Sequence, residues 1–295
     1  MNMTKKRRKV SGFDVLMYTL SALMLIIVAY PLILVLSNSV SDPGKVATGQ
    51  IVFLPKGFNF DGYKAVFGNE DIRIGFMNTI FYTVVGTAVN LVITLPAGYA
   101  LTKKSMPGRN LIMTIFMITM YFGGGMIPTF LLITKMGLYN SRAAIIILGA
   151  FSTYYCIVCR SFFESLPIEL EEAATIDGCS PIRTFVSIVL PLSKALIGVM
   201  VLYYAVGHWN SYFTEMIYLN DDSKQPLQVF LRRMLILAQN ALDMDDGGEY
   251  AVAQSKREAL LRYSIIVVSS LPLLVVYPFL QKYFDKGVLI GSVKG

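Results

Sequence analysis

Six apolar runs, each long enough to cross the roughly 30 Å of hydrocarbon in a bilayer, restrict what this chain can fold into. They cover residues 15–36, 74–101, 111–133, 143–163, 195–219 and 264–281. Inside a membrane the backbone polar groups must be hydrogen-bonded within the protein, and segments of this length meet that requirement as α-helices. The sequence therefore predicts an all-α integral membrane protein with six transmembrane helices.

Composition agrees with this fold class, because 55% of the 295 residues are hydrophobic and only 15% are charged. Such a chain is too apolar for a water-soluble domain of this size. The first run also follows a basic tail, as in a cleaved signal peptide, but the run from Val15 to Leu36 is longer than a signal peptide's apolar segment. We therefore interpret it as a retained first span.

Basic residues near the span ends set the expected orientation. Five lie together at 5–9 and three lie in the 102–110 loop, against two in the 134–142 turn. Totals over the whole chain hardly discriminate, but the positive-inside rule applies to short segments next to spans. Both termini and the 164–192 loop are therefore predicted to be cytoplasmic. The basic tail is interpreted as an anchor on anionic lipid, not as a nucleic-acid patch.

These spans divide the chain into predicted regions. The regions are a cytoplasmic basic tail 1–14, a first span 15–36, an outer segment 37–73, a core 74–281 with an outer loop 220–262, and a cytoplasmic tail 282–295. Within the outer loop, apolar residues recur at helical spacing over 227–235, but Arg232 and Arg233 at its middle disfavour a seventh span. We predict a helix at the outer surface there.

The 164–192 loop carries its own start and stop signals. Acidic residues at 169–172 favour the first turn of a short helix, and Gly178 supplies a left-handed stop. Ser180 is a candidate N-cap followed by Pro181, and the second helix is expected to end at Pro191. Two short helices joined at a glycine would form a compact projection that fits a groove on another protein.

Two spans carry polar stripes, and groups of this kind are costly against lipid, so we expect them to face the bundle interior. Because uncharged polar groups mixed with aromatic rings suit a sugar, we take them as substrate-path candidates. Hydrogen bonding between helices, with an interfacial aromatic belt, is the alternative for each residue. The candidates are Asn78, Tyr82 and Asn90 in the second span, and Tyr204, His208, Trp209, Asn210 and Tyr212 in the fifth. In the third span, Gly123–Gly125 with Pro128 predicts a break that either opens to a cavity or kinks a packed helix.

The chemistry-bearing motifs of enzymes are missing from the sequence. It has no phosphate-binding G-x-x-x-x-G-K-[ST] loop, no metalloprotease motif and no nucleophile elbow, and His208 is its single histidine. The pair Cys156 and Cys159 stands alone within a span, which favours packing. We therefore expect no catalysis, cofactor or metal site on this chain, with any ATP and Mg²⁺ bound by another protein.

The 164–192 loop resembles the EAA loop of ABC importer membrane subunits. It has Glu172-Ala173-Ala174, then Gly178 after three residues, then Ile188-x-Leu190-Pro191. From about residue 70 onward the chain is similar to permeases of the maltose-type carbohydrate importers, of the MalG-like and LplC/YtcP-like kind. Further matching positions are Asn78-Thr79, Tyr99-Ala100-Leu101, Trp209-Asn210 and the terminal run 291–295.

The resemblance implies a type I importer permease in a bacterial cell membrane, which couples ATP hydrolysis by a partner to alternating access for sugars, in particular oligosaccharides. It implies four kinds of partner: a second homologous permease, two cytoplasmic ABC ATPases, an external sugar-binding protein and the sugar itself. The residues that it assigns to ATPase coupling are Glu171, Glu172, Ala173, Ala174, Asp177, Gly178, Leu190 and Pro191.

Other function classes remain as alternatives. A secondary transporter needs ion-coordinating residues within its spans, but Glu215 is the only acidic one. A membrane scaffold has no use for a loop with this spacing. Among importers, an amino-acid or ion cargo competes with sugar.

Overall fold

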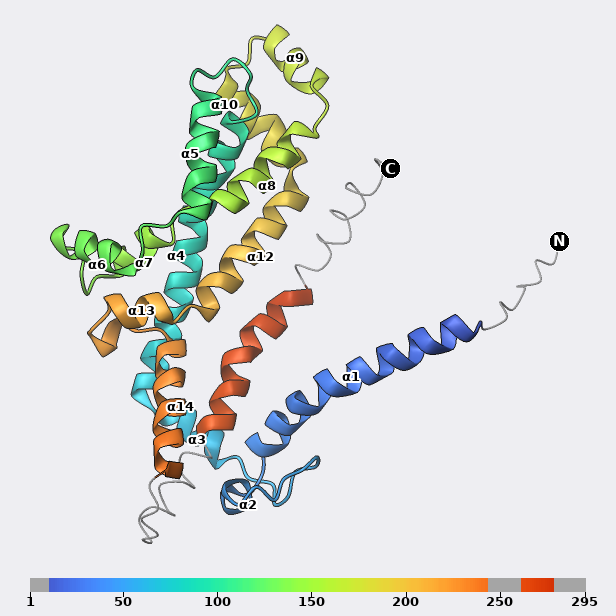
Figure 1. The fold of residues 1–295 in the computed structure, drawn as a ribbon, viewed down its shortest axis with the longest axis vertical. Helices are drawn as coiled ribbons and strands as arrows, with labels where there is room; N and C mark the ends of the chain where they lie inside the picture. Colours follow the sequence, from blue (N-terminus) through green and yellow to red (C-terminus); the bar gives the residue numbers. More distant parts are fainter. Residues whose placement is uncertain (1–10, 244–260, 279–295) are drawn as a thin grey trace. The chain divides into compact units, whose positions relative to one another are not determined.

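A computed structural model describes residues 11–243 and 261–278, and the regular structure of these residues is helical (Figure 1). The chain divides into two compact units, Met1–Gly68 with Met234–Val268, and Asn69–Arg233 with Ser269–Gly295. The basic tail up to residue 10, residues 244–260 of the predicted outer loop, the last residues of the predicted sixth span and the C-terminal tail lie outside the described residues.

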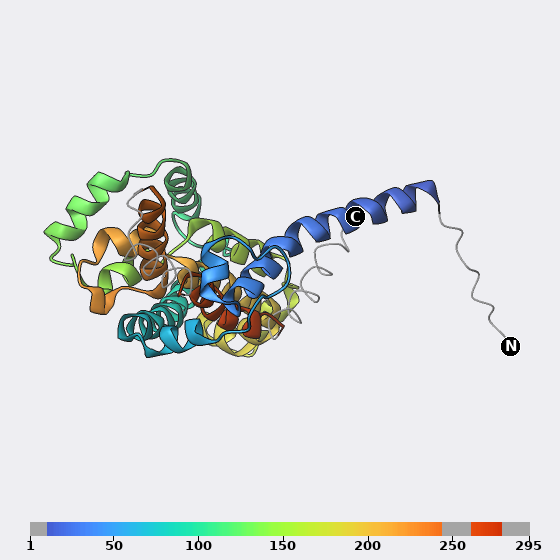
Figure 2. The ribbon, with the colours of Figure 1, turned by 90° about the horizontal axis from the view of Figure 1, so that it is seen from below.

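In the first unit, α1 (Gly12–Ser39) is one continuous helix, which Figure 2 shows in blue. A capping box starts it, since the backbone N–H of Ser11 donates to the Asp14 carboxylate at 2.9 Å. Its side chains are exposed over most of its length, and burial begins at Ser37. The exposed apolar side chains of α1 give it the surface of a lipid-facing span.

Two short helices, α2 (Pro43–Ala47) and α3 (Asp61–Gly68), follow in the predicted outer segment. Asp42 caps α2, and its carboxylate accepts from the N–H of Gly44 at 3.0 Å. The end of α1 is held by the Ser39 hydroxyl, which shares a 2.8 Å hydrogen bond with the Tyr63 hydroxyl of α3. The segment after the first span is therefore ordered by side-chain bonds between polar groups.

The second unit is built around α4 (Glu70–Ala100), which packs against α8 (Thr153–Glu164) and α12 (Lys194–Asn210), as Figure 1 shows. Glycines allow close contact between these helices, as is usual in membrane bundles. A Cβ added to Gly98 of α4 would lie 2.8 Å from the Cβ of Cys159. Cys156 and Cys159 are fully buried in α8 and unpaired, which confirms the packing role expected for them.

The described residues contain three helices that are long and apolar enough to cross a membrane: Gly12–Ser39, Glu70–Ala100 and Leu261–Pro278. They also contain three bent helix pairs that reach the same length together. Two of the pairs fall within the predicted third and fourth spans, whereas the third pair joins Pro181–Leu192 of the 164–192 loop to α12 of the predicted fifth span.

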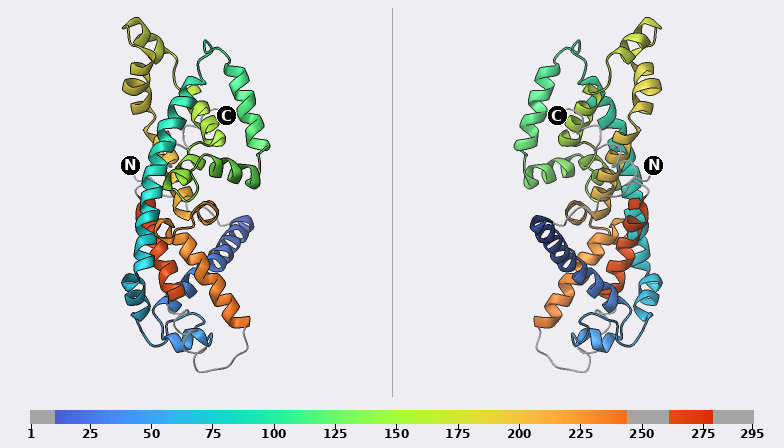
Figure 3. Two further views of the ribbon diagram at one scale, coloured as in Figure 1. Left: turned by 90° about the vertical axis from the view of Figure 1, so that its left-hand side faces the viewer. Right: turned by 90° about the vertical axis from the view of Figure 1, so that its right-hand side faces the viewer.

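The predicted third span is the most strongly bent. It consists of α5 (Arg109–Tyr121) and α6 (Met126–Lys135), whose axes differ by 113°, a turn that Figure 3 shows in green. The glycine run separates them, and Gly125 has a φ of +85°. The predicted break is confirmed, because the positive φ at Gly125, which glycine adopts readily, redirects the chain.

The predicted fourth span is divided between α7 (Arg142–Leu148) and α8, with a bend of 50°. The predicted fifth span, 195–219, is wrong as one helix. α12 ends at Asn210, Ser211 is extended, and α13 (Phe213–Tyr218) begins a new helix. The Asn210 amide donates to the carbonyl of Val206 at 3.0 Å, and polar side chains of this kind compete with helical backbone bonds.

After α13, a single 3₁₀ turn η2 (Asp222–Lys224) leads into α14 (Leu227–Asp243). Leu227 and Val229 are fully buried, whereas Arg232 and Arg233 are exposed. The helix predicted at 227–235 is therefore present. Its predicted place at the outer membrane surface stays a prediction.

Candidate functional site

The first helix of the 164–192 loop, α9 (Glu169–Ile176), ends in a Schellman motif at Gly178. The N–H of Cys179 donates to the carbonyl of Ala174 at 2.9 Å, and the N–H of Gly178 donates to that of Thr175 at 3.0 Å. Gly178 has a φ of +76°, a conformation that glycine adopts without a steric cost. The left-handed stop expected at this glycine is confirmed.

The second helix begins at α10 (Pro181–Thr184), where the Ser180 hydroxyl accepts from the N–H of Arg183 and Pro181 occupies the first turn, as predicted. The expected end at Pro191 is wrong. The helix continues through a π-helical turn, η1 (Phe185–Val189), into α11 (Leu190–Leu192), which Ser193 caps. The wider π turn accommodates the proline, because the N–H of Leu190 reaches back five residues to the carbonyl of Phe185.

The two short helices leave apolar side chains exposed on both sides of the Gly178 turn. Ile176 is 86% exposed and Ile182 is 78% exposed. Ala174 is buried, and Leu190 is half-buried. The other residues assigned to coupling are exposed, except for the half-buried Glu171: Glu172, Ala173, Asp177, Gly178 and Pro191.

One side chain at the end of α4 contacts several parts of this loop region. The Tyr99 ring stacks on Phe185 with centroids 4.9 Å apart, and it meets Phe163 of α8 edge-on at 5.9 Å. The ammonium group of Lys103 lies 4.0 Å above the centroid of the same ring and forms an ion pair with Glu171 of α9. Tyr99 and Lys103 thus tie α4 to the flanks of the loop and to α9.

A pocket of ≈ 350 Å³ lies at this junction, between the end of α4, the turn after it, and the second helix of the loop. Its walls are almost wholly apolar and include Pro96, Met106 and Ile182. The Lys103 side chain also lines it. The pocket therefore lies where the end of α4 meets the second helix of the loop.

Midway along α4, a buried amide joins three segments. The Asn90 amide donates to the carbonyl of Gly149, at the bend between α7 and α8, at 2.6 Å. Its oxygen lies 2.7 Å from His208 Nε2 of α12, an arrangement in which Nε2 carries the proton. Space for the ring is provided by Gly86, because a Cβ there would lie 2.6 Å from His208.

The remaining fifth-span candidates are in different surroundings. The Tyr204 hydroxyl shares a 2.7 Å hydrogen bond with Thr94 of α4. The buried Trp209 donates to the carbonyl of Ser269 at 3.0 Å. Asn210 and Tyr212 are exposed at the break between α12 and α13. The structure therefore joins Asn90 to His208 and separates Tyr212 from the helix that carries the others.

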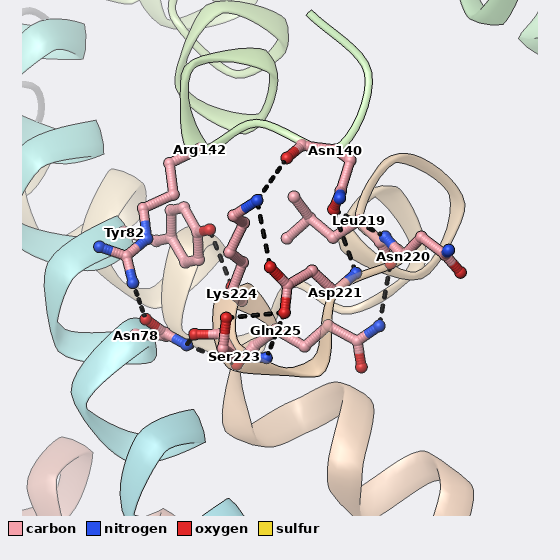
Figure 4. A network of polar contacts seen from close by, with 10 residues as sticks. All are labelled: Asn78, Tyr82, Asn140, Arg142, Leu219, Asn220, Asp221, Ser223, Lys224 and Gln225. Atoms are coloured by element: carbon pink, nitrogen blue, oxygen red, sulfur yellow. Dashed lines mark hydrogen bonds and ion pairs between the residues drawn. The ribbon is translucent and has the colours of Figure 1, made fainter.

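Near the other end of α4, Asn78 and Tyr82 hold the segment that follows α13 (Figure 4). The Asn78 amide donates to the carbonyls of Ser223 at 2.8 Å and Gln225 at 3.0 Å. The Tyr82 hydroxyl donates to the carbonyl of Lys224 at 2.9 Å. Both candidates are buried and bind backbone of their own chain.

The turn before α7 holds the same segment from its other side (Figure 4). Asn140, with a φ of +58°, accepts through its side-chain oxygen from the N–H groups of Asn220 and Asp221, both at 3.1 Å. Arg142 donates to the Asn78 oxygen at 2.8 Å. Hydrogen bonds from Ser223 hold the pKa of the Asp221 carboxyl below its usual value.

Sequence reasoning missed Lys103, Asn140 and Arg142 as parts of these networks. Lys103 and Arg142 entered only as charges that set orientation. Their partners lie 68 and 64 residues away in sequence, so local spacing gives no signal for them. Asn140 is the exception, because asparagine in a short turn is a recognised signal of left-handed backbone.

The family described as "Binding-protein-dependent transport system inner membrane component" matches residues 91–290. The polygalacturonan/rhamnogalacturonan transport system permease protein YtcP of Bacillus subtilis is 38% identical over 283 residues, which are 96% of this chain and 98% of YtcP. Protein LplC of the same species is 42% identical over 265 residues, 90% of this chain and 89% of LplC.

Among solved structures, a chain of a bacterial ABC transporter involved in the import of the acidic polysaccharide alginate superimposes with a TM-score of 0.83. It is 33% identical in sequence, and the match covers 94% of this chain and 99% of that one. The helical fold of this chain, its loop at Gly178 and its long apolar segments all agree with these matches. The chain belongs to the family of inner-membrane components of binding-protein-dependent transport systems, the permease subunits of ABC importers.

Proposed function

We propose that this chain is a permease subunit of an ATP-driven importer for oligosaccharides, with oligomers of sugar acids as the preferred cargo. The relatives support this choice, because YtcP is named for polygalacturonan and rhamnogalacturonan and the matching structure for the acidic polysaccharide alginate. The arabinooligosaccharides transport system permease protein AraQ of Bacillus subtilis, 28% identical over 244 residues, supports oligosaccharides as the general class of cargo.

The observation that carries the coupling role is the projection formed by α9 and α10 around Gly178. It exposes Ile176 and Ile182 on either side of the hydrogen-bonded turn at Gly178, and exposed apolar side chains on a compact helical pair fit a groove on a partner protein. We assign that partner as an ABC ATPase. The exposed acidic and small residues at this turn, Glu172, Ala173, Asp177 and Gly178, would lie in its groove. The half-buried Glu171 and the buried Ala174 would support α9, and Leu190 and Pro191 would support the second helix.

Movement of the docked projection would pass to the spans on either side of it. The loop continues directly from α8 and leads through α11 into α12, whose axis is turned by 83° from the preceding helical segment. ATP-driven closure of the two ATPases would therefore turn α8 and α12 and switch the access of a central path. No chemical step takes place on this chain, and ATP and Mg²⁺ are bound by the ATPases.

The full assembly would contain this chain, a second homologous permease, two ATPases and an external binding protein that delivers the sugar. Both termini and the 164–192 loop would face the cytoplasm in a bacterial cell membrane. Of the substrate-path candidates, Asn210 and Tyr212 have exposed side chains and would contact the sugar. The buried and half-buried ones, Asn78, Tyr82, Asn90, Tyr204, His208 and Trp209, would fix the helices that line its path.

Reconstitution tests this function. The chain is co-expressed with its neighbouring permease, ATPase and binding-protein partners, and the purified complex is placed in liposomes. ATP-dependent uptake of galacturonate oligomers, and not of neutral maltodextrins of equal length, is the expected result. Failure of any ATPase to co-purify would overturn the coupling role, and uptake of maltodextrins alone would overturn the choice of cargo.

A further inference from the structure

Tyr99 and Lys103 connect the 164–192 loop to α4, a helix that the loop does not join covalently. Tyr99 belongs to the last turn of α4, and Lys103 lies in the turn that follows it. Tyr99 contacts Phe163 just before the loop and Phe185 within it. The Lys103 ammonium adds a third contact, the ion pair with Glu171 of α9.

The Lys103–Glu171 pair is suited to positioning more than to stabilising the fold. The two side chains are 30% and 31% exposed, and pairs that water reaches contribute little to stability. The ring of Tyr99 beneath the ammonium restricts where Lys103 points, so that its carboxylate partner is held in one direction. The pair therefore fixes α9 relative to the end of α4.

α4 is well placed to carry a movement along the bundle. Gly98, next to Tyr99, packs against Cys159 of α8 so closely that an added Cβ would lie 2.8 Å away. Further along the same helix, Asn90 bonds to the bend before α8, and Asn78 bonds to the segment after α13. A displacement entering α4 at Lys103 would reach each of these contacts.

We propose that Lys103 is a positioning residue that makes α4 move together with α9, so that the ATPase-driven displacement enters the bundle through Glu171 and Tyr99 as well as through α8 and α12. This inference rests on the proposed coupling role of the loop. It adds a third driven helix, the one that carries the polar stripe with Asn78, Tyr82 and Asn90.

The test measures the distance between two spin labels within this chain, in the complex assembled with its ATPases in liposomes. One label replaces Glu169, an exposed residue of α9, and the other replaces Val92, which is 74% exposed on α4. The three native cysteines, two of them buried, are replaced by alanine beforehand. Distances are recorded without nucleotide and after trapping with ATP and vanadate, so the readout does not depend on the sugar.

In the unmodified loop, one narrow distance distribution that stays the same in both states is expected, because α9 and α4 move as one body. Lys103→Met and Glu171→Gln should each broaden and shift that distribution in the trapped state. Lys104→Met is the matched control, since its exposed side chain is the direct neighbour, and it should leave the distribution unchanged. Steady-state ATP hydrolysis by the same samples shows that each complex is assembled.

Two further variants separate positioning from damage. Lys103→Arg keeps the charge above Tyr99 and should preserve the narrow distribution. The double variant Lys103→Glu/Glu171→Lys should give a narrower distance distribution than either single charge reversal, because it restores the ion pair. The contact of the ammonium with the Tyr99 ring is lost in it.

An unchanged distribution in Lys103→Met would overturn the inference while leaving the proposed function intact, provided that the wild-type complex hydrolyses ATP. Equal broadening in Lys104→Met would also overturn it. A wild-type chain that assembles with no ATPase would overturn the proposed function and this inference with it.

Discussion

Replacing Gly178 with alanine perturbs the 164–192 loop at its turn and at no other contact. The residue has a φ of +76°, and a Cβ added there would meet no heavy atom within 4 Å. The substitution therefore causes no clash. Its cost is the strain of holding a side chain in the left-handed region.

That strain amounts to about 1–2 kcal/mol for an L-residue other than glycine, asparagine or aspartate. If the ATPase binds the turn as the structure has it, binding must hold the substituted alanine in that conformation, and the ATPase affinity should fall by a factor of roughly 5–30. Gly178→Asn should weaken binding less, because asparagine adopts left-handed backbone more readily. Gly178→Val should weaken it more, since its branched side chain is a true outlier there.

The assay is a titration of the detergent-solubilised permease pair with purified fluorescent ATPase. Gly108→Ala is the matched control, because Gly108 has a φ of +71°, equally open surroundings and a place in a different loop. Membrane insertion should be normal for all variants. Wild-type ATPase affinity in Gly178→Ala, or an equal loss of affinity in Gly108→Ala, would refute the claim that the ATPase binds this turn.

Two other predictions address the bundle and the loop surface. Gly86→Ala should lower the melting temperature of the purified chain, because its Cβ would lie 2.6 Å from the His208 ring, whereas Gly207→Ala, with open space around it, should not; equal melting temperatures would contradict the close packing. A maleimide reagent should label the half-buried Cys179 in membranes and leave the two fully buried cysteines of α8 unmodified, as peptide mass spectrometry can check. Labelling of the α8 pair at the same rate would contradict the packing of α4 on α8.

Sequence reasoning predicts best where a local rule decides the backbone. The stop at Gly178 and the cap at Ser180 follow from the chain alone and are present, because each depends on a few adjacent residues. The break in the third span follows from its glycine run in the same way. Its angle of 113° does not, because the direction after left-handed backbone depends on several dihedral angles together.

Two predictions from local sequence, the helix end at Pro191 and the continuous fifth span, are wrong because a second local feature determines the backbone there. Pro191 does not end its helix, since a π turn immediately before it removes the conflict that a proline creates in an α-helix. The fifth span does not run through Ser211, where polar side chains compete for the backbone. The pairing of Lys103 with Glu171 could not be predicted from the sequence for a different reason. It joins segments that only the folded bundle brings together.

The central claim is that the projection around Gly178 docks into an ATPase. Its most direct test places a single cysteine at Ile176, which is 86% exposed, in a chain whose native cysteines are replaced, and adds a short bifunctional crosslinker to sealed membranes containing the assembled complex. A crosslink to the ATPase, lost when the ATPase is stripped from the membrane, is the predicted result. Modification of this cysteine by a membrane-impermeant reagent added outside intact cells, with no ATPase crosslink, would contradict the account.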